Sequence, residues 1–384
     1  MAKLKEVCTF YSGTGFPTKY QGNDEGEYAF YKVSDIANNV QLGNTYLSVC
    51  NNYISGEIAK EIKGCILPKD TVVFAKIGEA VKLNRRAITS ADCLIDNNAM
   101  GLAPIQDKLR LDYFFYYMRN LKMEKLAEST TVPSVRKSLL EELEIKVPSL
   151  EEQKEIGEIL DKVSVVIQTR KQEIEQLDLL IKARFVELFG DININDKNWK
   201  YEPLGELCTI VRGGSPRPIE QFLGGDVPWI KIGDATDGDS IYLNSTKEHI
   251  IQEGIKKSRL VKEGSLIFAN CGVSLGFARI ITFDGCIHDG WLAMEDIDER
   301  LDKVFLLQAL NQMTEHFRAI APAGTQPNLN TAIMKAYKQV IPPIELQREF
   351  INFAKQVTKS KVAVQKALNE TQILFDSLMQ EYFG

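Results

Sequence analysis

The sequence has few of the residues from which metal sites and disulfide frameworks are built. Its 384 residues include three histidines, which are far apart and form no metal-ligand spacing. The seven cysteines are odd in number, scattered, and nowhere spaced C-x-x-C. This pattern predicts reduced, mostly buried thiols in a cytoplasmic protein. We therefore expect this chain to hold no metal.

Long apolar runs are also absent. No stretch approaches the roughly 18 consecutive apolar residues that a transmembrane helix requires. The first residues, Met1–Val7, lack the apolar core and cleavage site of a signal peptide. An apolar fraction of 44% is ordinary for a globular protein. The sequence thus predicts a cytoplasmic protein without membrane association, and its length favours two or three domains.

Positive charge is outweighed by negative charge, and the net charge is −6. Phosphate contacts usually dominate the affinity of nucleic-acid-binding proteins, so this sign excludes a chain that binds DNA through its overall charge. Local basic surfaces remain compatible with it. Any DNA binding is therefore expected to be assisted by a more basic partner.

Catalytic motifs are missing as well. There is no G-x-x-x-x-G-K-[ST] phosphate loop and no Asn/Asp-Pro-Pro-Tyr/Phe string for amino-methylation. Gly13-Thr14-Gly15 is a lone G-x-G, more typical of a turn. Glu61-Ile62-Lys63 imitates a nuclease E-x-K but has no upstream partner, and His288-Asp289 is best read as a structural pair. We expect no catalytic residues and no enzyme activity in this chain.

What the sequence does have is a long internal repeat. The stretch from Val147 to Gly190 recurs without a gap from Ile341 to Gly384, at an offset of 194 residues. Matched pairs include Pro148 and Pro342, Glu151 and Glu345, Gln153 and Gln347, and Phe189 and Phe383. A repeat that closes both the first half and the whole chain predicts a tandem duplication.

The stretches between these copies repeat more weakly. Thr71–Gly78 matches Ser265–Gly272 at the same offset, and Phe30–Asp35 matches Trp229–Asp234. Both halves have short β-like runs, such as Tyr28–Val33 and Thr71–Ile77, and the first has a helix-like segment at Leu111–Leu121. Leu4–Thr9 resembles Leu204–Thr209, and a Gly-containing turn follows each of these segments, at Gly13–Pro17 and Gly213–Pro218. The predicted organisation is a first globular domain at 1–146, a helix at 147–190, a linker at 191–197, a second globular domain at 198–340 and a second helix at 341–384.

Each long repeat has the spacing of a coiled-coil helix. Apolar residues alternate at steps of four and three, interrupted by Arg170 in the first copy and by Lys361 and Thr371 in the second. Ser149 and Glu152 have capping-box spacing, and Gly190 is a natural residue to follow the helix. The predicted seam comprises Ile156, Leu160, Val163, Ile167, Ile174, Leu177, Ile181, Phe350, Val357, Val364, Leu368 and Phe375.

Neither helix has enough apolar surface to stand alone, so each needs a partner. The economical partner is the other copy, packed antiparallel. The alternative is that each helix folds back on its own domain. The predicted fold is therefore α+β, with two similar globular domains separated by a pair of long antiparallel coiled-coil helices in a pseudo-twofold tandem repeat.

These motifs together resemble the specificity subunit of type I restriction-modification systems. The resemblance rests on the duplicated Pro-x-x-Glu-x-Gln helix starts, on Thr325–Asn330 and on Pro343–Glu349, and it covers the whole chain. It implies two target recognition domains, each reading one half of a bipartite asymmetric site in double-stranded DNA. It also implies that the helices set the spacer and dock two methyltransferase subunits, which in turn bind restriction (translocase/endonuclease) subunits. S-adenosylmethionine, ATP and Mg would be held by those partners, and no cofactor by this chain.

Candidate DNA contacts are the polar, aromatic and basic residues expected on loops. For each, the alternative is an ordinary solvated side chain; the turns at Thr131/Pro133 and Thr325/Pro327 are expected to cap the domains. The candidates are Tyr11, Thr14, Lys19, Tyr20, Lys76, Lys82, Arg85 and Arg86 in the first half, and Arg212, Ser215, Arg217, Lys231, Asn270 and Arg279 in the second.

Other functions remain open at this point. The recognition subunit of a bipartite-cutting type II system shares the same build, and only the partner genes would separate the two. A coiled-coil scaffold with two protein-binding heads belongs to a different class and predicts no DNA affinity even when a methyltransferase is present. A stand-alone nuclease or methyltransferase is disfavoured by the missing motifs.

Overall fold

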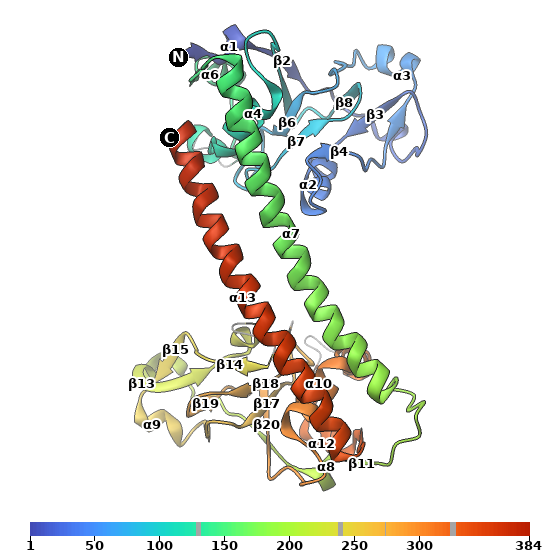
Figure 1. Ribbon diagram of the computed structural model, residues 1–384, viewed down its shortest axis with the longest axis vertical. Helices are drawn as coiled ribbons and strands as arrows, with labels where there is room; N and C mark the ends of the chain where they lie inside the picture. Colours follow the sequence, from blue (N-terminus) through green and yellow to red (C-terminus); the bar gives the residue numbers. More distant parts are fainter. Residues whose placement is uncertain (128–131, 237–240, 273, 323–327) are drawn as a thin grey trace. The chain divides into compact units, whose positions relative to one another are not determined.

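The structure, a computed structural model, describes residues 1–127, 132–236, 241–272, 274–322 and 328–384 (Figure 1). It divides into two compact units. The first comprises Met1–Lys171 together with Lys366–Gly384, and the second comprises Gln172–Gln365. Each unit therefore contains one β-rich domain and part of both long helices.

The first unit is built on a five-stranded sheet and a three-stranded sheet. The larger sheet has the order β2 (Cys8–Ser12), β9 (Ala99–Pro104), β6 (Val72–Ala75), β7 (Arg86–Thr89), β4 (Tyr46–Leu47), and the smaller β5 (Tyr53–Ile54), β3 (Tyr28–Tyr31), β8 (Cys93–Ile95). Strand β1 (Ala2–Lys3) pairs with β10 (Glu144–Ile145). The helices are α1 (Leu4–Val7), α2 (Val33–Gln41), α3 (Gly56–Glu61), α4 (Leu111–Asn120), α5 (Met123–Leu126) and α6 (Lys137–Glu141), with 3-10 turns η1 (Thr18–Tyr20) and η2 (Glu79–Val81).

Side-chain alternation along β6 divides the core of the first domain into two clusters. Val72 and Phe74 belong to the cluster that contains α4, whereas Val73 belongs to a second cluster on the opposite face of the sheet. Both chain ends, Ala2 and Phe383, pack against the first cluster. The five-stranded sheet is thus covered on both faces.

The predicted elements of this half are confirmed with one correction. The strand expected over Thr71–Ile77 is β6, and the helix expected over Leu111–Leu121 is α4. The strand expected over Tyr28–Val33 ends at Tyr31, because Val33 begins helix α2. Asp35 fixes this boundary, since its carboxylate accepts a hydrogen bond from the backbone N–H of Lys32 at 2.8 Å.

The second unit repeats the five-stranded order. Its sheets are β12 (Thr209–Arg212), β20 (Trp291–Glu295), β17 (Leu266–Ala269), β18 (Ala278–Ile281), β14 (Tyr242–Leu243), and β15 (Glu248–Ile250), β13 (Leu223–Ile230), β19 (Gly285–Ile287), β16 (Arg259–Val261), with β11 (Tyr201–Pro203) paired to β21 (Lys338–Val340). The helices are α8 (Leu204–Leu207), α9 (Gln252–Ile255), α10 (Lys303–Gln312), α11 (Thr314–Ile320) and α12 (Thr331–Ala336), with 3-10 turns η3 (Ile219–Gln221) and η4 (Ile232–Thr236). The weak sequence repeat therefore corresponds to a repeated fold.

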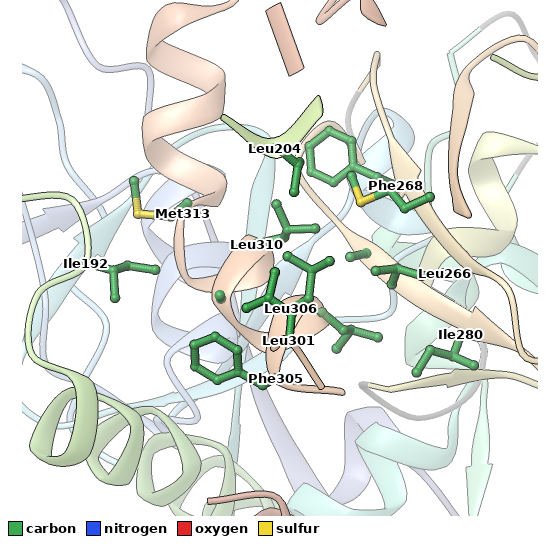
Figure 2. Packing of buried hydrophobic residues seen from close by; sticks show 14 of the residues in the cluster. Ile192, Leu204, Leu266, Phe268, Ile280, Leu301, Phe305, Leu306, Leu310 and Met313 are labelled. Atoms are coloured by element: carbon green, nitrogen blue, oxygen red, sulfur yellow. The ribbon is translucent and has the colours of Figure 1, made fainter. Parts of the chain in front are cut away.

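The core of the second unit lies between helix α10 and the sheet. Figure 2 shows Phe305, Leu306 and Leu310 of α10 beside Leu266 and Phe268 of β17. All five side chains are fully buried. In the first unit, α4 packs on the equivalent side of the sheet, against Val72 and Phe74 of β6.

The two long helices are α7 (Leu150–Phe189) and α13 (Ile344–Phe383), each of 40 residues. The capping box predicted at the start of α7 is confirmed, because Ser149 Oγ accepts from Glu152 N at 3.3 Å while the Glu152 carboxylate accepts from Ser149 N at 2.9 Å. Gly190 ends α7 with a positive φ of 75°, a backbone conformation that favours glycine.

The helices pack against each other, and the direction is antiparallel. In the second unit, Lys361 Nζ lies 2.6 Å from Asp178 Oδ1, while Arg184 bonds to Glu349 at 2.5 Å. The α13 partner number therefore falls as α7 advances. In the first unit, Arg170 donates to the Ala367 carbonyl and to Thr371 Oγ1. The polar residues that interrupt the predicted seam thus contact the opposite helix, and all twelve seam residues are buried or half-buried.

Each helix is also fastened to its own domain by a buried glutamine. Gln153 Nε2 donates to the Lys108 carbonyl at 3.0 Å, and its Oε1 accepts from Arg110 N at 2.8 Å. Gln347 makes the equivalent bonds, to the Arg300 carbonyl and from Asp302 N, both at 2.8 Å. Both glutamines are fully buried and hydrogen-bonded at both ends of the amide.

We predict that Phe185→Ala destabilises the second unit by about 3–5 kcal/mol, because it empties a site surrounded by Phe189, Phe305 and Phe350. All three tryptophans lie in this unit, so urea unfolding followed by tryptophan fluorescence reports on it. The matched control is Val186→Ala, at a side chain that is 52% exposed; we expect it to change stability by less than about 0.5 kcal/mol. Equal effects of the two substitutions would contradict the packing described here.

Candidate nucleic-acid interface

A glycine follows β2 in the first domain and β12 in the second. Each lies against the backbone of the residue that follows another strand, β8 or β19. A Cβ at Gly13 would stand 1.7 Å from the Asp96 carbonyl oxygen, and one at Gly213 would stand 2.2 Å from the His288 carbonyl oxygen. Thr14 N donates to the Ile95 carbonyl at 2.8 Å. Only glycine permits this approach, so both domains hold the turn in the same place.

In the second unit, four of the predicted DNA contacts lie on this turn or beside it. Arg212 Nε donates to the Asp289 carbonyl at 3.0 Å, and Ser215 Oγ to Asp289 Oδ1 at 2.8 Å. Lys231 and Arg217 lie close enough to His288 to influence its charge. We call Arg212, Ser215, Arg217, Lys231, His288 and Asp289 the His288 cluster.

The electrostatics of this cluster centre on the imidazole. Burial lowers the pKa of His288, and the cations Lys231, Arg217 and Arg212 lower it further, while Asp289 opposes them. The His288 Nδ1 atom lies 3.0 Å from the Asp289 carboxylate, and the ring packs 5.6 Å from the Trp229 ring, centre to centre. Burial and the nearby cations thus favour the neutral imidazole, and one of these cations, Lys231, is paired with Glu248 at 2.6 Å.

The first unit presents different side chains at the corresponding turn. Thr14 Oγ1 accepts from Cys65 N at 3.0 Å, Lys19 Nζ pairs with Glu61 at 3.0 Å and lies over the Tyr20 ring, and Tyr11 is half-buried. Lys32 stands where Lys231 stands in the second unit, and its Nζ donates to Gln21 Oε1 at 3.1 Å. Lys32 was not among the predicted contacts, although the match between Phe30–Asp35 and Trp229–Asp234 aligns it with Lys231.

The sequence interpretation of His288 and Asp289 as a structural pair did not predict that they lie beside the turn. Their proximity to the turn depends on the pairing of β13 with β19, which brings Ile230 beside Ile287. No motif in the sequence indicates that pairing.

Three candidates do not lie on exposed loops as expected. Arg86 and Arg279 belong to strands β7 and β18 and are buried, each with its guanidinium over a phenylalanine ring, Phe74 or Phe277. Asn270 is fully buried and donates to Asn328 Oδ1 and to the Leu329 carbonyl, both at 3.1 Å. The loop placements of Arg86 and Arg279 were wrong because strand positions in a covered sheet enclose even polar side chains, whereas Asn270, directly after β17, is enclosed by its contacts with Asn328 and Leu329.

Two candidates of the first unit, Arg86 and Tyr11, lie on opposite faces of the five-stranded sheet. Arg86 lies opposite Phe74 in the strand register, on the face covered by α4, whereas Tyr11 packs with the cluster on the other face. Lys82, which pairs with Glu79 at 2.8 Å, and the half-buried Arg85 adjoin Arg86 in sequence. Lys76 follows β6 and is half-buried. Of the domain-capping turns, Thr131, Thr325 and Pro327 lie outside the described residues.

Within the described part of the chain, no three His, Cys, Asp or Glu side chains gather as metal ligands. No helix among the described residues has the length and apolar character needed to cross a membrane. What the turns offer is hydrogen-bond donors, cations and aromatic rings, which suit recognition of a polyanion.

Comparison with known proteins identifies the family. The family model for the "Type I restriction modification DNA specificity domain" matches residues 1–179 and 196–371, which is most of the chain. The chain belongs to the type I restriction-modification specificity subunits. It is a DNA target-specificity subunit with two target recognition domains, and such subunits are non-catalytic and generally bind no cofactor.

The chain is similar to several curated relatives across most of their length. It is 22% identical to the MjaIX specificity subunit of Methanocaldococcus jannaschii over 98% of this chain and 90% of that one. It is 24% identical to a putative type I specificity subunit of Haemophilus influenzae over 84% of each chain.

Solved structures share the fold. The type I S subunit from M. genitalium superposes with a TM-score of 0.57 at 17% identity, over 100% of this chain and 95% of that one. A chain from a structural study of type I complex assembly and conformational transition gives a TM-score of 0.61 at 18% identity, over 100% and 96%.

The His288 environment generates a pH prediction. We expect an NMR titration midpoint for His288 below its ordinary value of about 6.5, because burial and three cations disfavour the imidazolium. Asp289→Asn removes the opposing carboxylate and should lower the midpoint further. A midpoint that rises in the Asp289→Asn protein would contradict this account of the cluster.

Proposed function

We propose that each target recognition domain reads one half of a bipartite, asymmetric DNA site. The observation that supports this most strongly is the repeated glycine turn, which is held identically in both domains but bears different side chains. Around it stand Lys19, Tyr20 and Lys32 in the first unit, and Arg212, Arg217 and Lys231 in the second. Unlike side chains on a shared scaffold predict half-sites of unlike sequence.

Tyr11, Thr14, Lys19, Tyr20 and Lys32 are the proposed contacts of the first domain. Arg212, Ser215, Arg217 and Lys231 are those of the second, with His288 and Asp289 orienting them. Arg217 is exposed and makes no side-chain hydrogen bond or ion pair with any described residue, so it is available to a phosphate or a base edge. Arg86, Asn270 and Arg279 are left out of the interface because their side chains are buried.

The helix pair is proposed to set the spacer and to dock two methyltransferase subunits. Support comes from apolar side chains that point away from the seam: Val165 and Leu179 on α7, and Val362 and Ile373 on α13, are 53–69% exposed. Several exposed apolar residues on one element mark a surface that a partner covers. Methylation with S-adenosylmethionine, and cleavage driven by ATP with Mg in the restriction subunits, would then take place in partner chains in the cytoplasm.

A decisive experiment is co-expression with the methyltransferase encoded beside this chain, followed by mapping of methylated adenines across the host genome. A split motif with two unlike half-sites and a fixed spacer is expected. A continuous motif, or methylation that persists when this chain is deleted, would rule out the proposal and favour a protein-binding scaffold. Cleavage by a partner without a translocase would point to a bipartite type II system.

Lengthening the helix pair generates a specific prediction. One extra heptad inserted at the same level of α7 and α13 adds about 10 Å of helix, or roughly three base pairs of DNA. We expect the methylated motif to keep both half-sites and to gain about that much spacer. A motif with altered half-site bases and the original spacer would show that the helices do not set the distance. A seven-residue insertion in the 191–197 linker is the control and should leave the spacer unchanged.

A further inference from the structure

The first unit contains a groove that the DNA contacts proposed above do not use. Its volume is about 1360 Å³. The walls are the segment Leu83–Arg86, helix α4 and the stretches 161–171 of α7 and 372–375 of α13. The groove thus lies between a target recognition domain and the helices that carry it.

The groove is positively charged although the whole chain is negative. Six cationic and three acidic side chains line it, a difference of three charges, against a net charge of −6 for the chain. Asp112 is neutralised by Arg110 at 2.7 Å, and Asp161 accepts from the Tyr116 hydroxyl at 2.6 Å. Lys69 and Asp70 adjoin in sequence and offset each other's charge, and the remaining cations are Arg85, Arg86, Arg119 and Lys171.

Arg86 is the most unusual of these cations. It is only 5% exposed, its terminal nitrogens bond to neutral oxygens of Asn84, Arg85 and Leu121, and its buried Nε has no hydrogen-bond partner. Among the described residues, no carboxylate hydrogen-bonds to it. Burial lowers the pKa of Arg86, which records the cost of an uncompensated buried charge. An anion in the groove would offset that cost.

The groove also exposes apolar and aromatic surface. The guanidinium of Arg119 lies 5.6–5.8 Å from the ring centres of Phe115, Tyr116 and Phe375. Leu83 is 56% exposed and Val165 is 63% exposed at the lining. The ligand should therefore offer both negative charge and apolar groups.

The described residues of the second unit do not repeat this charge pattern at the equivalent position. Arg86 pairs with Phe74 in the sheet, and the residue that pairs with the equivalent Phe268 is Ala278. Gln153 bonds to residue 108 and its counterpart Gln347 bonds to residue 300, so equivalent positions in this region differ by 192 residues. By this offset, the counterpart of Arg119 is Asn311. Asn311 is occupied with the backbone of Ala278, bonding to its N at 2.7 Å. The second unit therefore has no arginine pair at this position, and its buried Arg279 lies elsewhere in the sheet, opposite Ile267.

We propose that this groove docks an acidic, partly apolar polypeptide segment of the methyltransferase subunit. The inference rests on the proposed function and adds where, and by what chemistry, one methyltransferase copy is held. A DNA backbone fits less well, since phosphates would leave the exposed apolar side chains of Leu83 and Val165 uncovered. The second methyltransferase copy binds without this contact.

The test measures binding of the purified methyltransferase of the same system to the full chain without DNA. The variant Leu83→Asp/Arg85→Glu should weaken one of the two binding events about tenfold or more. The matched control Arg259→Glu/Leu260→Asp alters an exposed cation and an exposed apolar residue in the second unit and should bind as wild type. Thermal unfolding of each variant verifies that it is folded.

A second measurement does not depend on a substitution that weakens binding. A photo-crosslinking amino acid at position 83 should capture a methyltransferase peptide rich in Asp, Glu and apolar residues, with or without DNA. Capture of DNA instead, or variant affinity equal to that of the control, would overturn the inference while leaving the proposed function standing. Wild type that binds no methyltransferase would overturn both. Arg217→Gln, which should lose DNA affinity only, distinguishes a DNA defect from a docking defect.

Discussion

The structure depends on the packing of α7 against α13. Each helix presents a seam of apolar residues too narrow to be stable in water alone, and each seam is covered by the other helix and by the adjoining domain. At the second-unit end, Phe185 and Phe189 of α7 pack around Phe350 of α13, with ring centres 5.3 and 5.6 Å apart. Through that contact both helices join the hydrophobic core of the second unit.

Polar residues in the seam give the packing its register. Arg170 bonds across to Ala367 and Thr371, and Lys361 bonds to both carboxylate oxygens of Asp178 at 2.6 and 2.7 Å. Apolar seams tolerate sliding by a heptad, whereas a charged residue inside a seam is satisfied only opposite its partner. The apolar residues therefore supply stability, and the polar ones select one alignment. A duplicated chain benefits from this selection, because its two helices are similar enough to pair in several ways.

Duplication also explains how much of the fold was predictable. The repeat, the capping box at Ser149 and Glu152, the glycine at 190 and the seam are local or periodic features, so the sequence alone indicated them. Side-chain placement was harder because it depends on strand register. Arg86 and Arg279 are both candidate contacts, one in each half, yet one lies opposite Phe74 and the other opposite Ile267, on different faces of equivalent sheets. The His288 cluster and the groove around Arg86 form from segments far apart in sequence, and no spacing rule brings them together.

The central claim is that the two helices pair within one chain and run antiparallel. A zero-length carbodiimide reagent tests it on the unmodified protein, because it joins an amine to a carboxylate in direct contact and Lys361 Nζ lies 2.6 Å from Asp178. Mass spectrometry of a mixture of isotopically light and heavy chains then separates links within a chain from links between chains. The account predicts a Lys361–Asp178 link whose two peptides always share one isotope label. Links that join light to heavy chains, or coupling of Lys361 to acidic residues near the start of α7, would contradict it.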